Sequence, residues 1–266
     1  MQLPTPDDFR ELRRTLPAIA AVLLVAALAF PMWTISVHAV QYPDTVLHLQ
    51  LYAYPHISGD YVEMARLNKY IGFYYPDPVY WSPNYQPNPN AVNVPEWSLG
   101  PLAFVGVAAA GAFVALAPDE ERLRRGLRWQ LVGTVAVFGV MLADIKYRLY
   151  QTGHSLDPNA PVMGVSGFTP PLWGKYEVAN ITSYSRLGLG AYLATCSVGL
   201  LVVAFYYRDK PVTFGDLPGR LRNLPGPIRE KLPGASDEDE LPESEDRDEP
   251  ADRDDRNQPP GHVGGD

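Results

Sequence analysis

The sequence predicts an all-α membrane protein with four transmembrane helices, two folded extracytoplasmic loops and a disordered acidic C-terminal tail. Four apolar runs lead to this prediction, because each is close to the roughly 20 residues that a helix needs to cross a hydrocarbon core. Segments rich in proline and aromatic residues separate the first run from the second and the third from the fourth. The chain then ends in an acidic stretch of low apolar content, which is typical of a disordered extension.

The first apolar run, Leu16–Val37, contains no charged residue. It is longer than the apolar part of a signal peptide, which is about 7–15 residues, so we expect a retained helix, with a cleaved signal peptide as the alternative. Pro31 is expected to kink this helix near its outer end. The expected segments are a cytoplasmic N-terminus at 1–15, transmembrane helices at 16–37, 98–117, 131–150 and 186–207, extracytoplasmic loops at 38–97 and 151–185, a cytoplasmic loop at 118–130 and the tail at 208–266.

The first extracytoplasmic loop is expected to fold, because it holds nine of the sixteen tyrosines and disordered linkers are poor in aromatic residues. Within it, Thr45–Tyr54 alternates apolar and polar residues, which predicts a short strand. Asp60, with Glu63 three residues later, has the spacing of a helix N-terminus, and Gly72 marks the expected end of that helix.

Each extracytoplasmic loop is too short and too poor in aliphatic residues to hold a core alone. We therefore expect the two loops to pack on each other and to form one docking surface. Aromatic residues dominate packed interfaces and binding hot spots. The residues expected to bind a protein partner are accordingly Tyr70, Tyr74, Trp81, Trp97, Phe168, Trp173 and Tyr184.

Basic residues predict the orientation in the membrane. Three arginines precede the first helix, four lie in the loop at 118–130, and Arg208 with Lys210 follows the last helix. By the positive-inside rule, both termini are cytoplasmic and the protein is a multi-pass component of the cell membrane. The sequon that begins at Asn180 would then lie on the outer side as a potential glycosylation acceptor.

Charge and cysteine content exclude several classes of protein. Residues 235–266 carry thirteen acids and three arginines, a net charge of −10, whereas the whole chain is −8, so the remainder sums to +2. An acidic tail of this kind also suits a halophile. The single cysteine, Cys196, excludes an internal disulfide, a thiolate zinc site and covalent c-type haem. The expected partners are the lipid bilayer and other membrane or extracytoplasmic proteins, without nucleic acid.

A metal site is the main chemical hypothesis. Imidazole and thioether side chains together suit copper. The candidate ligands, all expected outside the membrane, are His48, His56, His154, Met64 and Met163. No pair of them has a local ligand spacing such as HxH. Asp144 is the only acid near the membrane interior, and Arg148 follows one helical turn later, which predicts an ion pair between the two.

Three stretches carry a resemblance to a known family: Gln41–Pro43, Leu67–Gly72 and the Gly-His-Ser-Leu-Asp-Pro-Asn-Ala-Pro segment at 153–161. There the chain resembles small four-span membrane proteins encoded beside nitrous oxide reductase in many clade II gene clusters. The resemblance covers residues 15 to 207 and implies an accessory role in making or supporting a copper enzyme outside the membrane. Relatives tend to have His in place of Lys69 and Met in place of Phe73, so the chain lacks two of that family's potential ligands.

The function expected from the sequence is thus an integral membrane accessory protein. It would support an extracytoplasmic copper enzyme, nitrous oxide reductase in denitrification, by docking through its outer loops. We identify no catalytic residue and do not expect an enzyme. The alternative is a non-catalytic anchoring or electron-transfer subunit of another membrane complex. Haem-based electron transfer within the bundle is disfavoured, since no predicted span holds a histidine away from its ends.

Overall fold

The structure is a computed structural model that describes residues 11–77, 91–162, 164–209 and 212–213. The chain divides into two units, Met1–Leu217 and Pro218–Asp266, and the second lies outside the described residues, as does most of the predicted acidic tail. The described part contains five α-helices and one five-stranded antiparallel sheet. The prediction of an all-α protein with four transmembrane helices is therefore wrong, because only three described helices are long and apolar enough to cross a membrane.

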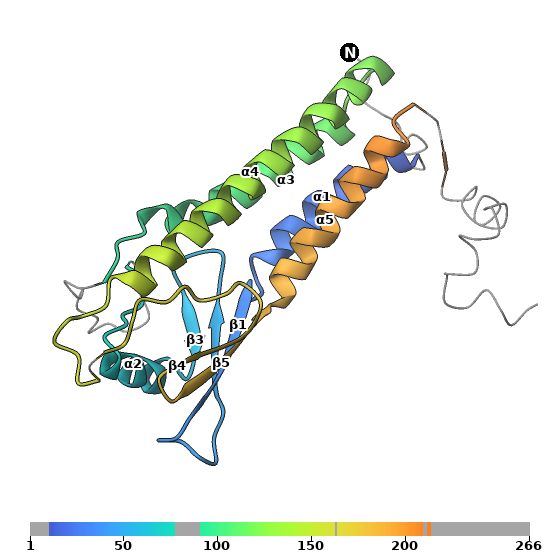
Figure 1. The fold of residues 1–266 in the computed structure, drawn as a ribbon. Helices are drawn as coiled ribbons and strands as arrows, with labels where there is room; N and C mark the ends of the chain where they lie inside the picture. The colour runs from blue at the N-terminus through green and yellow to red at the C-terminus, as the bar shows by residue number, and fades with distance from the viewer. Residues whose placement is uncertain (1–10, 78–90, 163, 210–211, 214–266) are drawn as a thin grey trace, which may run out of the picture. The chain divides into compact units, whose positions relative to one another are not determined.

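Figure 1 shows α1, α3, α4 and α5 running side by side, with the sheet and α2 at one end of them. The helices are α1 (Leu12–Ala27), α2 (Tyr61–Tyr70), the short 3-10 helix η2 (Pro95–Leu99), α3 (Gly100–Ala115), α4 (Glu120–His154) and α5 (Leu189–Tyr206). The strands are β1 (Trp33–Ala39), β2 (Leu47–Leu51), β3 (Ile57–Gly59), β4 (Gly174–Val178) and β5 (Ile181–Leu187). They are arranged in the order β3-β2-β1-β5-β4.

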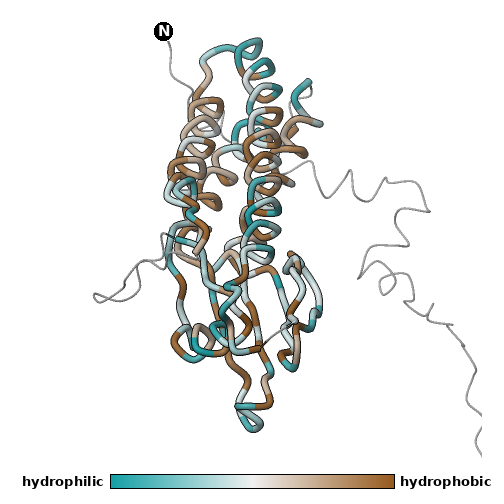
Figure 2. The backbone as a smooth tube through the Cα atoms, turned by 60° about the vertical axis from the view of Figure 1, so that its left-hand side comes forward, coloured by the Kyte–Doolittle hydropathy of each residue, from teal (hydrophilic) through white to brown (hydrophobic). Residues whose placement is uncertain are grey.

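The three spanning candidates are Pro95–Ala115, which joins η2 to α3, and the helices α4 and α5. Their outward faces carry large apolar side chains, and Phe113 is 81% exposed and Val140 is 70% exposed. Figure 2 shows hydrophobic residues along the helices and hydrophilic ones at the turn between α3 and α4. By length and composition, these three helices could cross a membrane.

Polar side chains inside the bundle join neighbouring helices. Gln130 Nε2 of α4 donates a hydrogen bond to the carbonyl of Val107 in α3 at 2.9 Å, and Ser197 Oγ of α5 donates to the carbonyl of Ala20 in α1 at 2.9 Å. Both donors are buried. Hydrogen bonds of this kind fix the position of one helix relative to its neighbour.

The largest error of the sequence prediction is the first apolar run. The predicted helix at 16–37 is helical only as far as Ala27, and the strand β1 begins at Trp33, two residues after Pro31. Proline has no N–H for the helix ladder, and the four residues Thr34–Val37 alternate polar and apolar side chains with three β-branched residues among them, which suits a strand.

Three other predicted boundaries also change. The loop at 118–130 and the helix at 131–150 form one helix, α4, of 35 residues. The predicted fourth helix begins at Leu189, because Arg186 and Leu187 belong to β5. The chain after residue 208 does not leave the fold at once, since Val212 is 1% exposed and packs with Leu12 and Leu127.

The sheet combines residues of both predicted loops, 38–97 and 151–185. The central strand β1 pairs with β2 from the first loop and with β5, which begins in the second. One face of the sheet is apolar, with Leu47, Leu49 and Ile181 packed against Met64 and Leu67 of α2. The predicted strand and helix of the first loop are thus present as β2 and α2, and the two loops share one core as expected.

The sheet joins the bundle through close backbone contacts. Gly188 donates a backbone hydrogen bond to the carbonyl of Met32 at 2.9 Å, and Gly190 donates one to the carbonyl of Pro31 at 2.9 Å. A Cβ on Gly188 would lie 2.1 Å from the oxygen of Pro31, so no larger residue fits there. At the same level, Gly100 at the start of α3 packs directly on the carbonyl of Ala53.

Candidate functional site

The face of the sheet opposite α2 is polar. Successive side chains of a strand point to opposite faces of the sheet, so the residues between those of the apolar face lie on this polar face. The register puts four of them, Lys175, Tyr184, Ser36 and His48, in one row across β4, β5, β1 and β2. Described polar residues flank this row, namely Thr34, His38, Gln50, Ser58, Glu177, Thr182 and Arg186. No described helix covers this outer face, as the arrangement in Figure 1 shows.

Side chains on the outer face contact one another across the strands. Ser36 Oγ and His48 Nδ1 are 3.1 Å apart, which is hydrogen-bond distance. The Tyr184 ring meets His38 edge-on at a centroid distance of 5.8 Å. At the rim, the carboxylate of Asp60 accepts a hydrogen bond from the backbone N–H of His48 at 2.8 Å. Asp60 therefore fastens α2 to β2 rather than capping its own helix, since it makes no side-chain cap bond.

Strand β4 forms one edge of the sheet and ends in a tight hairpin. The turn residues are Ala179, which has a positive φ of 52°, and Asn180, which is exposed at the tip. On the same strand, Lys175 Nζ lies 2.6 Å from Glu177 Oε1. This contact lowers the pKa of the Glu177 carboxyl and raises the pKa of the Lys175 ammonium. Trp173, the residue before β4, is 61% exposed.

The predicted metal ligands belong to separate surroundings. His48 lies on the outer sheet face, His56 stacks on Tyr54 at 5.7 Å, and His154 at the end of α4 stacks on Tyr150 at 4.0 Å. Met64 is 3% exposed in the sheet core, and Met163 lies outside the described residues. Among the described residues there is no group of three or more His, Cys, Asp or Glu side chains that could hold a metal ion.

The aromatic residues predicted to bind a partner are also dispersed, and Trp81 lies outside the described residues. Trp97 donates its indole N–H to the carbonyl of Tyr52 at 3.0 Å, and the Phe168 ring lies 5.7 Å from that of Phe73 at the edge of the core. These two are occupied by internal contacts. Tyr74 donates to Asp157 at 3.4 Å and so joins the two loops. The exposed members are Tyr70 and Trp173, and Tyr184 is half-buried on the outer face.

The predicted pair of Asp144 and Arg148 lies where the bundle meets the sheet domain. Arg148 Nε is 3.9 Å from Asp144 Oδ1 but 2.5 Å from Glu96 Oε1 of η2. Gln151 receives a further hydrogen bond from Arg148 at 2.9 Å. The guanidinium thus joins α4 to the segment that enters α3, and its main acidic partner is Glu96, which is far away in the sequence.

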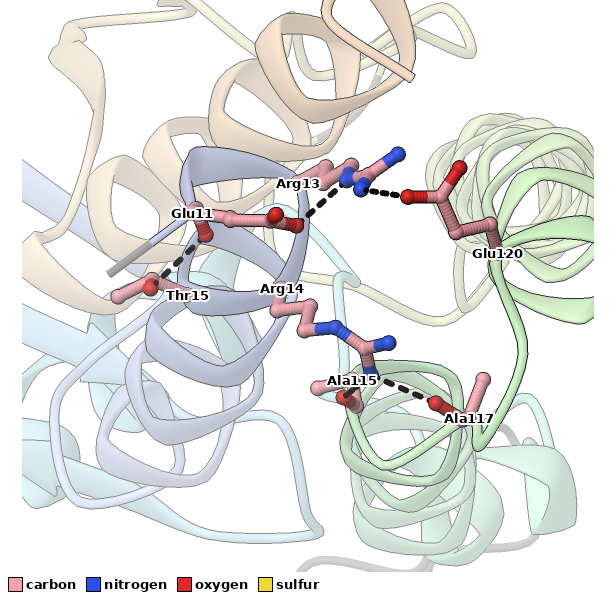
Figure 3. Close-up of polar contacts among 7 residues, drawn as sticks. All are labelled: Glu11, Arg13, Arg14, Thr15, Ala115, Ala117 and Glu120. Carbon is pink, nitrogen blue, oxygen red and sulfur yellow. Dashed lines mark hydrogen bonds and ion pairs between the residues drawn. The ribbon is translucent and has the colours of Figure 1, made fainter. Parts of the chain in front are cut away.

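The opposite end of the bundle holds a second polar cluster, shown in Figure 3. Arg13, 3% exposed, lies 2.6 Å from both Glu11 Oε2 and Glu120 Oε1. Arg14, 5% exposed, donates to the carbonyls of Ala115 at 3.2 Å and Ala117 at 2.6 Å. Positive charge at the carboxyl end of a helix is favourable, so Arg14 closes the end of α3 while Arg13 fixes the start of α4.

Comparison of the chain with family models, with curated proteins and with solved structures gives no match. Arg13, Arg14, Lys175 and Glu177 were not predicted as site residues, although each has a signal in the sequence. The two arginines directly precede an apolar run, and residues 174–178 alternate as a strand does before a two-residue turn. The surroundings of these residues depend on partners distant in the chain, such as Glu120 and Ala117.

Proposed function

We propose that this chain is an integral membrane protein that holds a small sheet domain outside the cytoplasmic membrane as a docking platform for another protein. The supporting observation is the asymmetry of the bundle. Its sides are apolar and exposed, and the sheet domain lies at one end. Arginines gather at the other end, namely Arg13 and Arg14 at the start of α1 and Arg122, Arg124 and Arg125 at the start of α4. Basic residues favour the cytoplasmic side.

The domain suits docking better than catalysis. Its outer face is broad, polar and uncovered by any described helix, and the described residues form no metal cluster. Docking needs a stable, presented surface, and the sheet has its own apolar core beneath this face. The resemblance in three stretches makes an extracytoplasmic copper enzyme of the nitrous oxide reductase kind the first partner to test.

Cysteine accessibility tests the orientation. In a Cys196→Ser background, we expect a cysteine introduced at the exposed Ser166 to react with a membrane-impermeant maleimide in intact cells. A cysteine at the exposed Arg125 should react only after the membrane is opened. The reverse labelling pattern would rule out the proposed orientation, and labelling of both positions in intact cells would rule out a membrane crossing between them.

A deletion tests the docking role. Loss of the gene should lower the activity of the partner copper enzyme, and the wild-type gene should restore it. A variant with the charges of the outer face altered, such as Arg186→Glu, should restore it poorly although the protein accumulates in the membrane. Full activity of the copper enzyme in the deletion strain would show that this enzyme does not depend on the protein and is not its partner.

A further inference from the structure

The edge strand β4 has backbone groups that no described residue uses. Val178 and Ile181 flank a two-residue turn, and residues in that position exchange both backbone hydrogen bonds. Because the pattern alternates, Gly174 and Tyr176 also point their N–H and C=O groups toward β5. Lys175 and Glu177 therefore direct theirs away from the sheet. No backbone hydrogen bond joins residues 174–178 to any described residue outside β5.

The free edge carries charges of opposite sign in a fixed order. Lys175 and Glu177 are 52% and 58% exposed, and both lie on the outer face two residues apart. An antiparallel strand added at this edge would place one residue opposite Lys175 and another opposite Glu177. Opposite charges directly across a strand pair stabilise it, and like charges destabilise it. Because the strands are antiparallel, the first residue of the added segment would lie opposite Glu177 and the third opposite Lys175. A fitting segment therefore has a basic residue, then any residue, then an acidic residue.

We propose that β4 accepts an extended strand of an extracytoplasmic protein partner, and that this strand carries a basic residue followed two positions later by an acidic one. This proposal rests on the proposed docking function and adds the element and the sequence pattern used. The middle residue of the added strand would lie opposite Tyr176 on the apolar side, where the ring of Phe168 is 6.4 Å away. An apolar side chain suits that position.

A second copy of this chain also has the fitting charge order, since its own β4 reads Lys175-Tyr176-Glu177. Antiparallel pairing of two identical strands reverses their direction. Strand β5 continues into α5 after only Gly188, so the reversed copy would point its helices away from the membrane that holds the first. The bundle thus favours a different protein as the occupant.

Peptide binding to the purified full-length protein in detergent tests the proposal. The probe is a fluorescent eight-residue peptide with the sequence of residues 173–180, and its twin has the Lys and Glu exchanged. At peptide concentrations up to about 1 mM, we expect the wild-type protein to bind the first peptide at least about threefold more tightly than the twin. The double variant Lys175→Glu/Glu177→Lys, which keeps an ion pair on β4, should invert this preference.

A third peptide separates strand addition from simple charge attraction. Methyl groups on the backbone nitrogens of its Lys and Glu remove the N–H groups that would face β4 and leave the side chains unchanged. We expect this peptide not to bind. Equal binding of the methylated peptide, the same preference on both proteins, or no binding of any peptide would each overturn the proposal.

Two further results assign the edge differently. Concentration-dependent dimerisation of the wild-type protein that Glu177→Lys abolishes would make a second copy the occupant and overturn the proposal. Peptide binding is measured in detergent and does not depend on the orientation in the membrane. If the peptides fail to bind while the maleimide labelling gives the expected pattern, the β4 proposal is wrong and the proposed docking function is unaffected. Labelling that puts the sheet inside the cell would overturn the extracytoplasmic partner even if the peptides bind.

Discussion

Arg13 in the first turn of α1 lies 2.6 Å from Glu120 in the first turn of α4, although the two residues are 107 positions apart. The guanidinium is 3% exposed, whereas the Glu120 side chain is 68% exposed. A second carboxylate, that of Glu11, shares the guanidinium at 2.6 Å. The two sides of this contact should therefore respond differently to mutation.

We expect Arg13→Ala to lower the free energy of unfolding by about 1.5–3 kcal/mol, because it removes two charge-assisted hydrogen bonds. Glu120→Gln should cost less than about 1 kcal/mol, since its carboxylate is mostly solvated and Arg13 keeps Glu11. Thermal unfolding of the purified protein in detergent measures both. Equal losses for the two variants would contradict the view that Arg13 is the buried centre of the cluster.

Two glycines of α3 form a matched pair for a test of packing. A Cβ at Gly100 would lie 1.8 Å from the carbonyl oxygen of Ala53, whereas nothing lies within 4 Å of a Cβ at Gly106. Gly100→Ala should push η2 and the β2–β3 connection apart and destabilise the protein by about 1–3 kcal/mol. Gly106→Ala should stabilise it by up to about 1 kcal/mol through higher helix propensity. The same thermal assay checks the opposite signs.

The end of the fold can be located by truncation. Val212 is 1% exposed among Leu12, Leu127 and other apolar residues, and its carbonyl accepts a hydrogen bond from the N–H of Leu12 at 2.9 Å. A chain that ends at Lys210 should lose about 1.5–3 kcal/mol with this side chain. A chain that ends at Leu217 should have the same melting temperature as the full-length protein. If both truncations melt together, Val212 contributes nothing to the bundle.

Asp77 should make stability depend on pH. Its Oδ1 atom is buried without a hydrogen-bond partner among the described residues, and this burial raises the pKa of the carboxyl above its ordinary value of 3.8. Because the folded protein holds the proton more tightly, stability is highest below the unfolded pKa and falls as pH rises through the folded pKa. Asp77→Asn should therefore stabilise the protein by up to about 1 kcal/mol at neutral pH.

The same substitution should have little effect well below pH 3.8, the ordinary pKa of the carboxyl, because the wild-type group is then protonated in both the folded and the unfolded state. Asp44→Asn, at an exposed position in the turn between β1 and β2, is the control. Melting curves of the three proteins at both pH values provide the comparison. A stabilisation by Asp77→Asn that is the same at both pH values would show that charge is not the cause.

The local patterns of residues 38–97 were sufficient to predict β2 and α2. Alternation over residues 45–54 is a signal within one segment, and so are Asp60 and Gly72 as the expected ends of a helix. The helix α2 indeed runs from Tyr61 to Tyr70, although the Asp60 side chain makes no cap bond. The mutual packing of the two loops also followed from their lack of aliphatic residues. These inferences need only nearby residues or the general cost of leaving a small loop without a core.

The rest depended on partners elsewhere in the chain. Trp33–Val37 reads as the end of an apolar run, and it becomes a strand because β2 and β5 flank it on both sides. Arg148 is one turn from Asp144, yet Glu96, 52 positions away, binds it more closely. Local periodicity cannot distinguish a helix from a strand in a short apolar segment, and it carries no information on which acid a basic residue will meet.

The junction between sheet and bundle also has a mechanical consequence. Only five residues separate α1 from β1 and only Gly188 separates β5 from α5, and backbone hydrogen bonds from Gly188 and Gly190 tie the two connections together. The neighbouring strands β1 and β5 are thus direct extensions of the helices α1 and α5. A sideways force on the sheet would therefore act on α1 and α5 as a torque. A rotation of the sheet and a tilt of these two helices should occur together.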